Sequence, residues 1–273
     1  IFIEDVMRFL DNVMSDFINR APDSFSNAKY SAMRERSVGL GVMGLHSFFQ
    51  QKNIPFGSVM SKVWNQKIFK HVQEKADQAS VKLAEERGPC PDAEEYGIKE
   101  RFSNKTAIAP TASISVICGG ASPGIEPIAA NSYTHKTLSG SFNVRNKYLA
   151  KILEKHGKND DETWSTLTTN QGSVSHLNFL TDIEKDTFKT AFEIDQRWIV
   201  ELGADRTPNI SQAQSINVFV PADIHKKDLH QIHFQAWKKG LKSLYYCRSK
   251  SIQRAENVNT GSSTDVTKNV YKA

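Results

Sequence analysis

The chain has 273 residues, of which 39% are hydrophobic and 24% are charged, and its formal net charge is +5. This length is enough for one large domain or two ordinary ones, and the composition is that of a globular protein, which excludes a fibrous or wholly disordered chain. No apolar run approaches the roughly 20 residues of a membrane span, and acidic residues interrupt positions 1–18, which excludes a secretory signal peptide there.

The apolar and polar pattern predicts alternating strands and helices. In chain order, the predicted elements are a helix over 1–18, a strand over 37–45, a helix over 46–51, a helix over 59–87, a strand over 106–109, a loop over 110–127, a helix over 182–202, a strand over 214–220, a helix over 222–239 and a strand over 241–246. Strands separated by helices need crossover connections, so we expect an α/β fold with a largely parallel sheet. From Arg248 onward the chain is polar, and we expect a flexible tail.

Charge and cysteine patterns exclude several kinds of site. Lysine and arginine are scattered, and no basic run is interleaved with aromatic residues, so we expect no DNA partner. Cys90, Cys118 and Cys247 have no paired spacing, which argues against a disulfide scaffold and a zinc site. We expect a cytoplasmic protein without a membrane partner. Because Ile1 stands inside a helical pattern, we expect residue 1 to be a cut within a longer sequence.

The first motif is glycine-rich and has two interpretations. Gly39, Gly41 and Gly44 match the glycine pattern of dinucleotide-binding turns. That pattern also needs an acidic residue about 20 positions later, and 58–70 contains no Asp or Glu. The alternative is a strand on which neighbouring backbone packs closely.

The second motif is PTASIS, residues 110–115, directly after a predicted strand. Small hydroxyl residues and free backbone N–H groups suit an anionic oxygen, especially where a helix begins after the turn. A simple helix cap is the alternative. The continuation GGASPGIEP, residues 119–127, favours the functional interpretation.

The third motif is the pair Tyr245 and Tyr246. In a regular strand the two side chains point to opposite faces, one to the core and one to the surface. A functional interpretation needs the backbone to bend, so that the two rings stack. Stacked phenols could pass an electron and a proton between them.

Together these motifs resemble the large subunit of class I ribonucleotide reductase. RERSVGLGVMGLHSF, APTASIS, SPGIEP, QAQSINVFV and LKSLYY occur in the order and approximate spacing of that family, over essentially all of residues 1–250. The wording RERSVGLGVMGLH looks most like versions from T4-like phages and their bacterial relatives. The resemblance also favours the packed-strand interpretation of the glycines.

The resemblance implies a fold and an assignment of site residues. The family fold is a ten-stranded α/β barrel, and residues 1–247 look like its second half, with five parallel strands and crossover helices, followed by a flexible tail over 248–273. Thr111, Ala112, Ser113 and Ile114 would bind the substrate diphosphate, mostly through backbone N–H groups. Tyr245 and Tyr246 would be the catalytic radical relay.

The resemblance also implies an activity and its partners. The reaction is the reduction of ribonucleoside diphosphates to deoxyribonucleoside diphosphates by thiyl-radical chemistry. A metal-containing small subunit would supply the radical, and thioredoxin or glutaredoxin would be the external thiol reductant. We expect no cofactor in this chain. The expected compartment is the cytoplasm of a bacterial or phage-infected host cell.

The cysteines depart from the family pattern. The family's radical cysteine and redox-partner cysteines precede the part that resembles this chain, so the N-terminal part of the large subunit is an expected partner. The family normally ends with a cysteine pair, and 249–273 contains no cysteine.

The resemblance assigns a docking role to the helix before the tyrosine pair. Lys226, Lys227, Lys238 and Lys239 would form a basic rim for the acidic tail of the small subunit. The expected apolar anchors are Leu229, Ile232 and Trp237. Two rival functions are a non-catalytic docking module for the small subunit and a nicotinamide-dependent dehydrogenase. His225, His230 and His233 share this helix without a metal-binding i, i+4 spacing, so we expect no metal.

Overall fold

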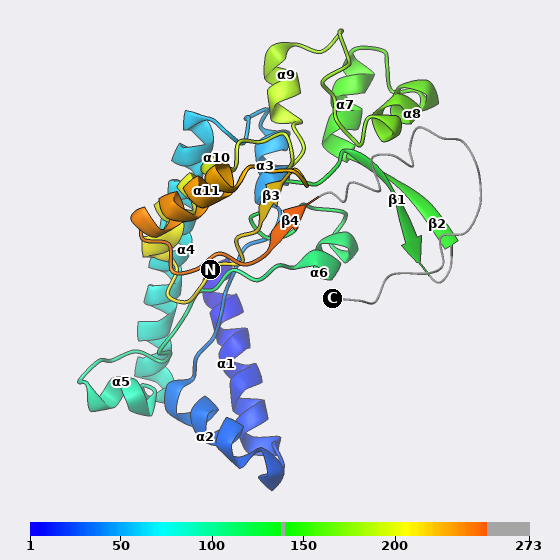
Figure 1. Cartoon of the computed structure of the whole chain (residues 1–273). Helices are drawn as coiled ribbons and strands as arrows, with labels where there is room; N and C mark the ends of the chain where they lie inside the picture. The colour runs from blue at the N-terminus through cyan, green and yellow to red at the C-terminus, as the bar shows by residue number, and fades with distance from the viewer. Residues whose placement is uncertain (138–139, 250–273) are drawn as a thin grey trace.

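Helices dominate the chain (Figure 1), whose computed structural model describes residues 1–137 and 140–249, with backbone alone over 135–137 and 140–142. The helices up to residue 117 are α1 (Phe2–Arg20), the 3-10 turn η1 (Asp23–Phe25), α2 (Ser26–Glu35), α3 (Leu45–Gln51), α4 (Val59–Arg87), α5 (Pro91–Glu95) and α6 (Ala112–Ile117). The later ones are α7 (Lys147–Lys155), α8 (Asp161–Thr169), α9 (Asp182–Thr187), α10 (Gln196–Arg206), the turn η2 (Thr207–Asn209) and α11 (Lys226–Lys238).

Short parallel segments lie side by side between these helices (Figure 1). The parallel pairings are Leu40 with Thr106, Ile108 with Gln214, and strand β3 (Val218–Val220) with strand β4 (Cys247–Ser249). Helices connect each segment to the next, which confirms the predicted α/β class with crossover helices. The regular strands are shorter than predicted: the run 37–45 contributes a single bridge, and the strand expected over 241–246 is formed instead by 247–249.

The glycine-rich run is held tightly against its neighbour. A Cβ added to Gly41 would lie 2.3 Å from the carbonyl oxygen of Ala107, so the two backbones approach too closely for any side chain. At the start of α3, the amide of Gly44 donates to the Ser122 carbonyl (2.9 Å), and that of Ser47 donates to the Ser122 hydroxyl (3.1 Å). The turn therefore offers these donors to the protein itself and not to a pyrophosphate. The packed-strand interpretation is confirmed, and the dinucleotide interpretation is wrong.

The long helix α4 follows its predicted limits. It begins with a capping box, in which the Ser58 hydroxyl accepts from the amide of Ser61, and it ends at Gly88, whose φ is +84°. Helix α1 packs on it. At their contact the buried carboxylate of Asp11 bonds three arginines: Arg36 (2.6 Å), Arg87 (2.6 Å) and Arg101 (2.9 Å). These charge-assisted bonds join α1, α4 and the loop segments that flank the parallel strands.

The single helix predicted over 182–202 is wrong, because the chain forms α9, a turn and then α10. In the turn, the Glu193 carboxylate accepts from both the amide and the hydroxyl of Thr190 (2.8 Å each). The amide of Ala191 donates to the carbonyl of Ile128 (2.7 Å), and the Asp195 side chain then caps α10. Local side-chain bonds thus replace the helical ones over 188–195.

An antiparallel hairpin that the sequence analysis did not assign stands beside α7 and α8 (Figure 1). Its strands are β1 (Ser132–Thr137) and β2 (Gly140–Arg145), and Ser132 lies opposite Arg145. The tail predicted from Arg248 begins inside β4, and residues 250–273 of that prediction lie outside the described residues.

Candidate functional site

The PTASIS loop turns directly into α6. Thr111 precedes the helix in the left-handed region, with φ of +50°, and its hydroxyl accepts from the amide of Gly124 (2.7 Å). Ala112, Ser113 and Ile114 form the exposed first turn of α6. The sequence-predicted phosphate-binding residues therefore stand together at one helix start.

The first-turn amides are open to a ligand. Within the described part of the chain, the backbone N–H groups of Ala112, Ser113 and Ile114 donate to no other residue. Ser115 differs, because it is buried and its hydroxyl donates to the Ala112 carbonyl (2.9 Å). Three adjacent free N–H groups can bind an anionic oxygen such as that of a phosphate.

The SPGIEP loop folds back onto the start of α6. Gly124 has φ of +45°, and an added Cβ would lie 2.8 Å from the Ala109 carbonyl oxygen, so only glycine fits. Glu126 is 7% exposed and accepts a hydrogen bond from Asn217 Nδ2 (2.5 Å). Burial raises the pKa of Glu126 above its ordinary value, while the Arg248 charge and the Asn217 hydrogen bond act in the opposite direction.

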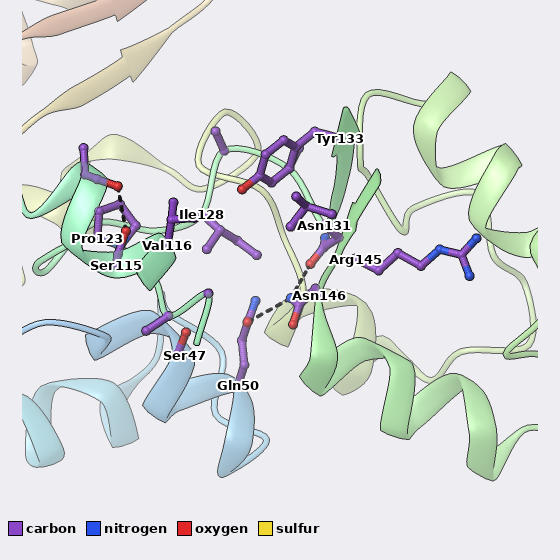
Figure 2. Close-up of a pocket in the computed structure, with 16 residues that line it drawn as sticks. Ser47, Gln50, Ser115, Val116, Pro123, Ile128, Asn131, Tyr133, Arg145 and Asn146 are labelled. Atoms are coloured by element: carbon purple, nitrogen blue, oxygen red, sulfur yellow. Dashed lines mark hydrogen bonds between the residues drawn. The ribbon is translucent and has the colours of Figure 1, made fainter. Parts of the chain in front are cut away.

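A cavity of about 360 Å³ lies beside α6, between α3 and the base of the hairpin (Figure 2). Its walls are largely apolar, and Val116 and Ile128 face into it, whereas the side chain of Arg145 extends away. Asn146 Nδ2 donates to Gln50 Oε1 (3.0 Å) and to Asn131 Oδ1 (2.8 Å), which gives one end of the cavity a cluster of amides. Such a cavity suits a flat, mostly apolar group with a polar edge.

The two tyrosines next to β4 contact each other. The ring centroids of Tyr245 and Tyr246 are 4.1 Å apart with an interplanar angle of 49°, and the Tyr245 hydroxyl donates to the Tyr246 hydroxyl at 3.3 Å. Their exposed fractions are 51% and 55%, so neither ring is in the core. The hydrogen bond to Tyr246 raises the pKa of Tyr245. The rings are in contact, as the functional interpretation required, but they are tilted rather than stacked.

Helix α11 presents a basic and aromatic outer face. All four lysines of the predicted docking rim are exposed: Lys226, Lys227, Lys238 and Lys239. Ile232 was expected to be an apolar anchor, and this is wrong, because it packs into the core against Val200 and Val218. Phe234 and Trp237 are the exposed apolar groups of the helix, with ring centroids 5.5 Å apart.

Cysteines and histidines form no further centre in the described residues. Cys90 is buried, Cys118 and Cys247 are exposed, and all three are free thiols. Across residues 1–137 and 140–249, no group of three or more His, Cys, Asp and Glu side chains is placed to hold a metal ion. The same residues include no helix with the length and apolar character of a membrane span.

One residue at the site, Asn217, escaped the sequence analysis. Asn217 is 1% exposed and contacts both Glu126 and the backbone of Tyr246. The sequence did contain a signal for it: an asparagine stands inside the apolar run SINVFV, and a buried amide side chain needs a hydrogen-bond partner.

The chain matches a known family over nearly all of its described length. The matching family is "Ribonucleotide reductase, barrel domain", over residues 2–100 and 92–247. A ribonucleoside-diphosphate reductase large subunit of Invertebrate iridescent virus 6 is 47% identical over 264 residues, which cover 95% of this chain and 27% of that protein. A large subunit of the same name from Caenorhabditis elegans is 33% identical, over 84% of this chain and 33% of that protein.

A solved structure shares the fold. The alpha subunit of the Actinobacillus ureae class Id ribonucleotide reductase superposes with a TM-score of 0.85 at 39% identity, over 91% of this chain and 46% of that one. The chain thus spans about a quarter to a half of the length of the relatives it matches.

Proposed function

Because the chain belongs to the ribonucleotide reductase barrel-domain family, we propose that it is the C-terminal part of a ribonucleoside-diphosphate reductase large subunit. It contributes the phosphate-binding loop and the tyrosine relay to the reduction of ribonucleoside diphosphates to deoxyribonucleoside diphosphates. The N-terminal part of the subunit supplies the catalytic cysteines. A metal-containing small subunit supplies the radical, and thioredoxin or glutaredoxin re-reduces the thiols.

The setting of this reaction is the cytoplasm of a bacterial or phage-infected host cell. The sequence segment RERSVGLGVMGLH supports a T4-like phage origin. Iridescent viruses and a nematode supply similar large subunits, so the family reaches well beyond phages.

The observation that carries the proposal is the contact between the two phenols. A phenol has a pKa of about 10, so its oxidation to a neutral radical must release a proton. With the hydroxyls 3.3 Å apart, the Tyr245 O–H bond breaks as the Tyr246 O–H bond forms. One electron and one proton move together from Tyr245 to the oxidised Tyr246, and the reverse transfer restores the pair. No charge is left on either ring.

The start of α6 supplies the substrate contact in this proposal. The free amides of Ala112, Ser113 and Ile114 bind the oxygens of the substrate diphosphate. The hydroxyl of Thr111 is already used by Gly124, so its role is to hold the loop rather than to bind phosphate through its side chain.

Helix α11 supplies the docking contact. Phe234 and Trp237 form an exposed apolar strip, and Lys226, Lys227 and Lys238 lie on the same helix. Lys239 already pairs with Glu201 (2.7 Å). A basic and aromatic face suits an acidic peptide tail. This face also favours the second candidate function, a docking module without a catalytic role.

Substitution of each tyrosine by phenylalanine separates the two functions. The change keeps the ring and removes the hydroxyl, so a structural tyrosine loses about 0.5–1.5 kcal/mol at most. We expect Tyr245→Phe and Tyr246→Phe each to abolish nucleotide reduction in the assembled reductase, with near-normal melting temperature and small-subunit affinity. Turnover above a few per cent of wild type in either variant contradicts an obligatory relay, and intact docking without reduction in any mixture supports the docking module.

A further inference from the structure

The backbone next to β3 contains one extra residue at the tyrosine pair. In a regular parallel ladder at this register, the amide of Tyr246 donates to the Ile216 carbonyl, and its carbonyl accepts from Val218. The carbonyl does accept from Val218 (2.9 Å), but the amide that donates to Ile216 is that of Tyr245 (2.8 Å). Two residues therefore lie opposite one, Asn217, and this is a β-bulge.

The bulge accounts for the side-by-side rings. Successive side chains of a regular strand point to opposite faces, which would separate Tyr245 from Tyr246. A bulge interrupts this alternation and redirects a side chain. It also leaves the amide of Tyr246 without a backbone carbonyl acceptor on the neighbouring strand, because the Ile216 carbonyl accepts from Tyr245 instead.

The side chain of Asn217 takes up that spare amide. Its Oδ1 accepts from the Tyr246 amide (2.9 Å), and its Nδ2 donates to Glu126 (2.5 Å). Asn217 is 1% exposed and Glu126 is 7% exposed, so solvent cannot readily replace either bond. The hydrogen bond to Glu126 also fixes which end of the amide faces Tyr246, because a carboxylate can only accept.

We propose that Asn217, oriented by Glu126, is the positioning residue of the tyrosine pair. It stabilises the bulge and thereby keeps the two phenols in contact on one side of the chain. Its importance for catalysis rests on the proposed function, but its effect on the ring geometry does not. Asn217 bonds the backbone of Tyr246 and not a ring hydroxyl, so its action passes through that backbone.

The contact between the two phenols can be tested by 19F NMR titration of protein labelled with 3-fluorotyrosine. The resonances of the pair are assigned with Tyr245→Phe and Tyr246→Phe, and each phenol is titrated. Because the hydrogen bond to Tyr246 raises the pKa of Tyr245, we expect Tyr245 to titrate above free 3-fluorotyrosine. In Asn217→Leu this elevation is lost, and reduction by the assembled reductase falls at least tenfold without a matching change in KM. Asn217→Ala serves as a smaller replacement if the leucine prevents folding.

The matched control is Gln214→Leu. Gln214 is also buried just before β3, but its side chain bonds Arg206 (2.6 Å), Gly203 and Thr207 instead of the backbone of a tyrosine. We expect this variant to lose stability while the titration of Tyr245 stays elevated.

Two outcomes overturn the proposal: an elevated Tyr245 titration in Asn217→Leu or Asn217→Ala, or its loss in Gln214→Leu. If the phenylalanine variants of the tyrosines still reduce nucleotides, the proposed function fails, but the titrations still decide whether Asn217 positions the pair.

Discussion

Replacement of His46 should change how the stability of the chain depends on pH. His46 is fully buried in α3, its Nδ1 accepts from the amide of Ile128 (3.0 Å), and its ring lies edge-on to Phe56 with centroids 5.3 Å apart. Burial lowers its pKa to about 3, and the nearby backbone of Thr187 opposes this lowering only in part. Nε2 makes no hydrogen bond of normal geometry within the described residues.

The sign and size of the effect follow from the two pKa values. The unfolded chain takes up a proton at His46 below pH about 6.5, whereas the folded chain does so only near 3. Between these values the unfolded state binds more protons, so stability falls as the pH falls. Because pH 5 lies about 1.5 units below the pKa of the unfolded state, protonation of His46 lowers the free energy of unfolding at pH 5 by about 2 kcal/mol.

Urea unfolding at pH 7 and pH 5 measures this contribution. His46→Asn keeps an acceptor for Ile128 and cannot titrate, so it should be less stable at pH 7 but lose about 2 kcal/mol less on acidification than wild type. His71→Asn is the matched control, because it makes the same substitution at an exposed position on α4. An equal loss in wild type and His46→Asn would refute the reasoning.

Three further predictions test the loop, the helix and the glycine strand. Ala112→Asp places a carboxylate beside the free amides of α6 and should raise the KM for the diphosphate at least tenfold in the assembled reductase; an unchanged KM removes the phosphate assignment. Glutamate at both Lys238 and Lys239 should weaken binding of an acidic small-subunit peptide and flatten its salt dependence in calorimetry; unchanged affinity speaks against docking on α11. Gly41→Ala should lower the free energy of unfolding by about 1–3 kcal/mol, because its Cβ meets the Ala107 carbonyl; a smaller loss shows that the strands can separate.

The elements predicted best from the sequence are those whose limits depend on neighbouring residues along the chain. Helix α4 is followed by a glycine and a proline, a stop signal in the sequence itself, and its bounds agree with the predicted 59–87. The glycine run was correctly interpreted because the missing acidic residue is a property of the sequence alone. In these cases neighbouring residues determine the outcome.

Elements that depend on distant partners were predicted less well. The turn between α9 and α10 is held where Ala191 bonds Ile128, a residue 63 positions earlier, and no local pattern reveals that contact. The strands of the hairpin, SYTHKT and GSFNVR, carry too few apolar residues to show a period of two. The tyrosine strand was misplaced because a bulge depends on how two segments are paired, not on the composition of either one.

The candidate site shows the same division. The residue types at Thr111–Ile114 and at the tyrosine pair were sufficient to select them as candidates, but the role of Asn217 depends on contacts with Glu126 and Tyr246, which are distant in sequence. A buried amide in an apolar strand signals that a partner exists, and only the fold identifies it.

One loop connects the two functional parts of the chain. Its Gly124 amide is bound by Thr111 at the start of α6, and two residues later Glu126 orients Asn217, which holds the backbone of Tyr246. The first two of these contacts are hydrogen bonds to the loop itself, whose backbone only glycine can complete at position 124. A substitution at Gly124 that distorts this backbone should therefore disturb both the amides proposed to bind phosphate and the phenol contact. A change confined to α11 should affect docking alone, because its inner face packs on Val200 and its neighbours and not on the loop.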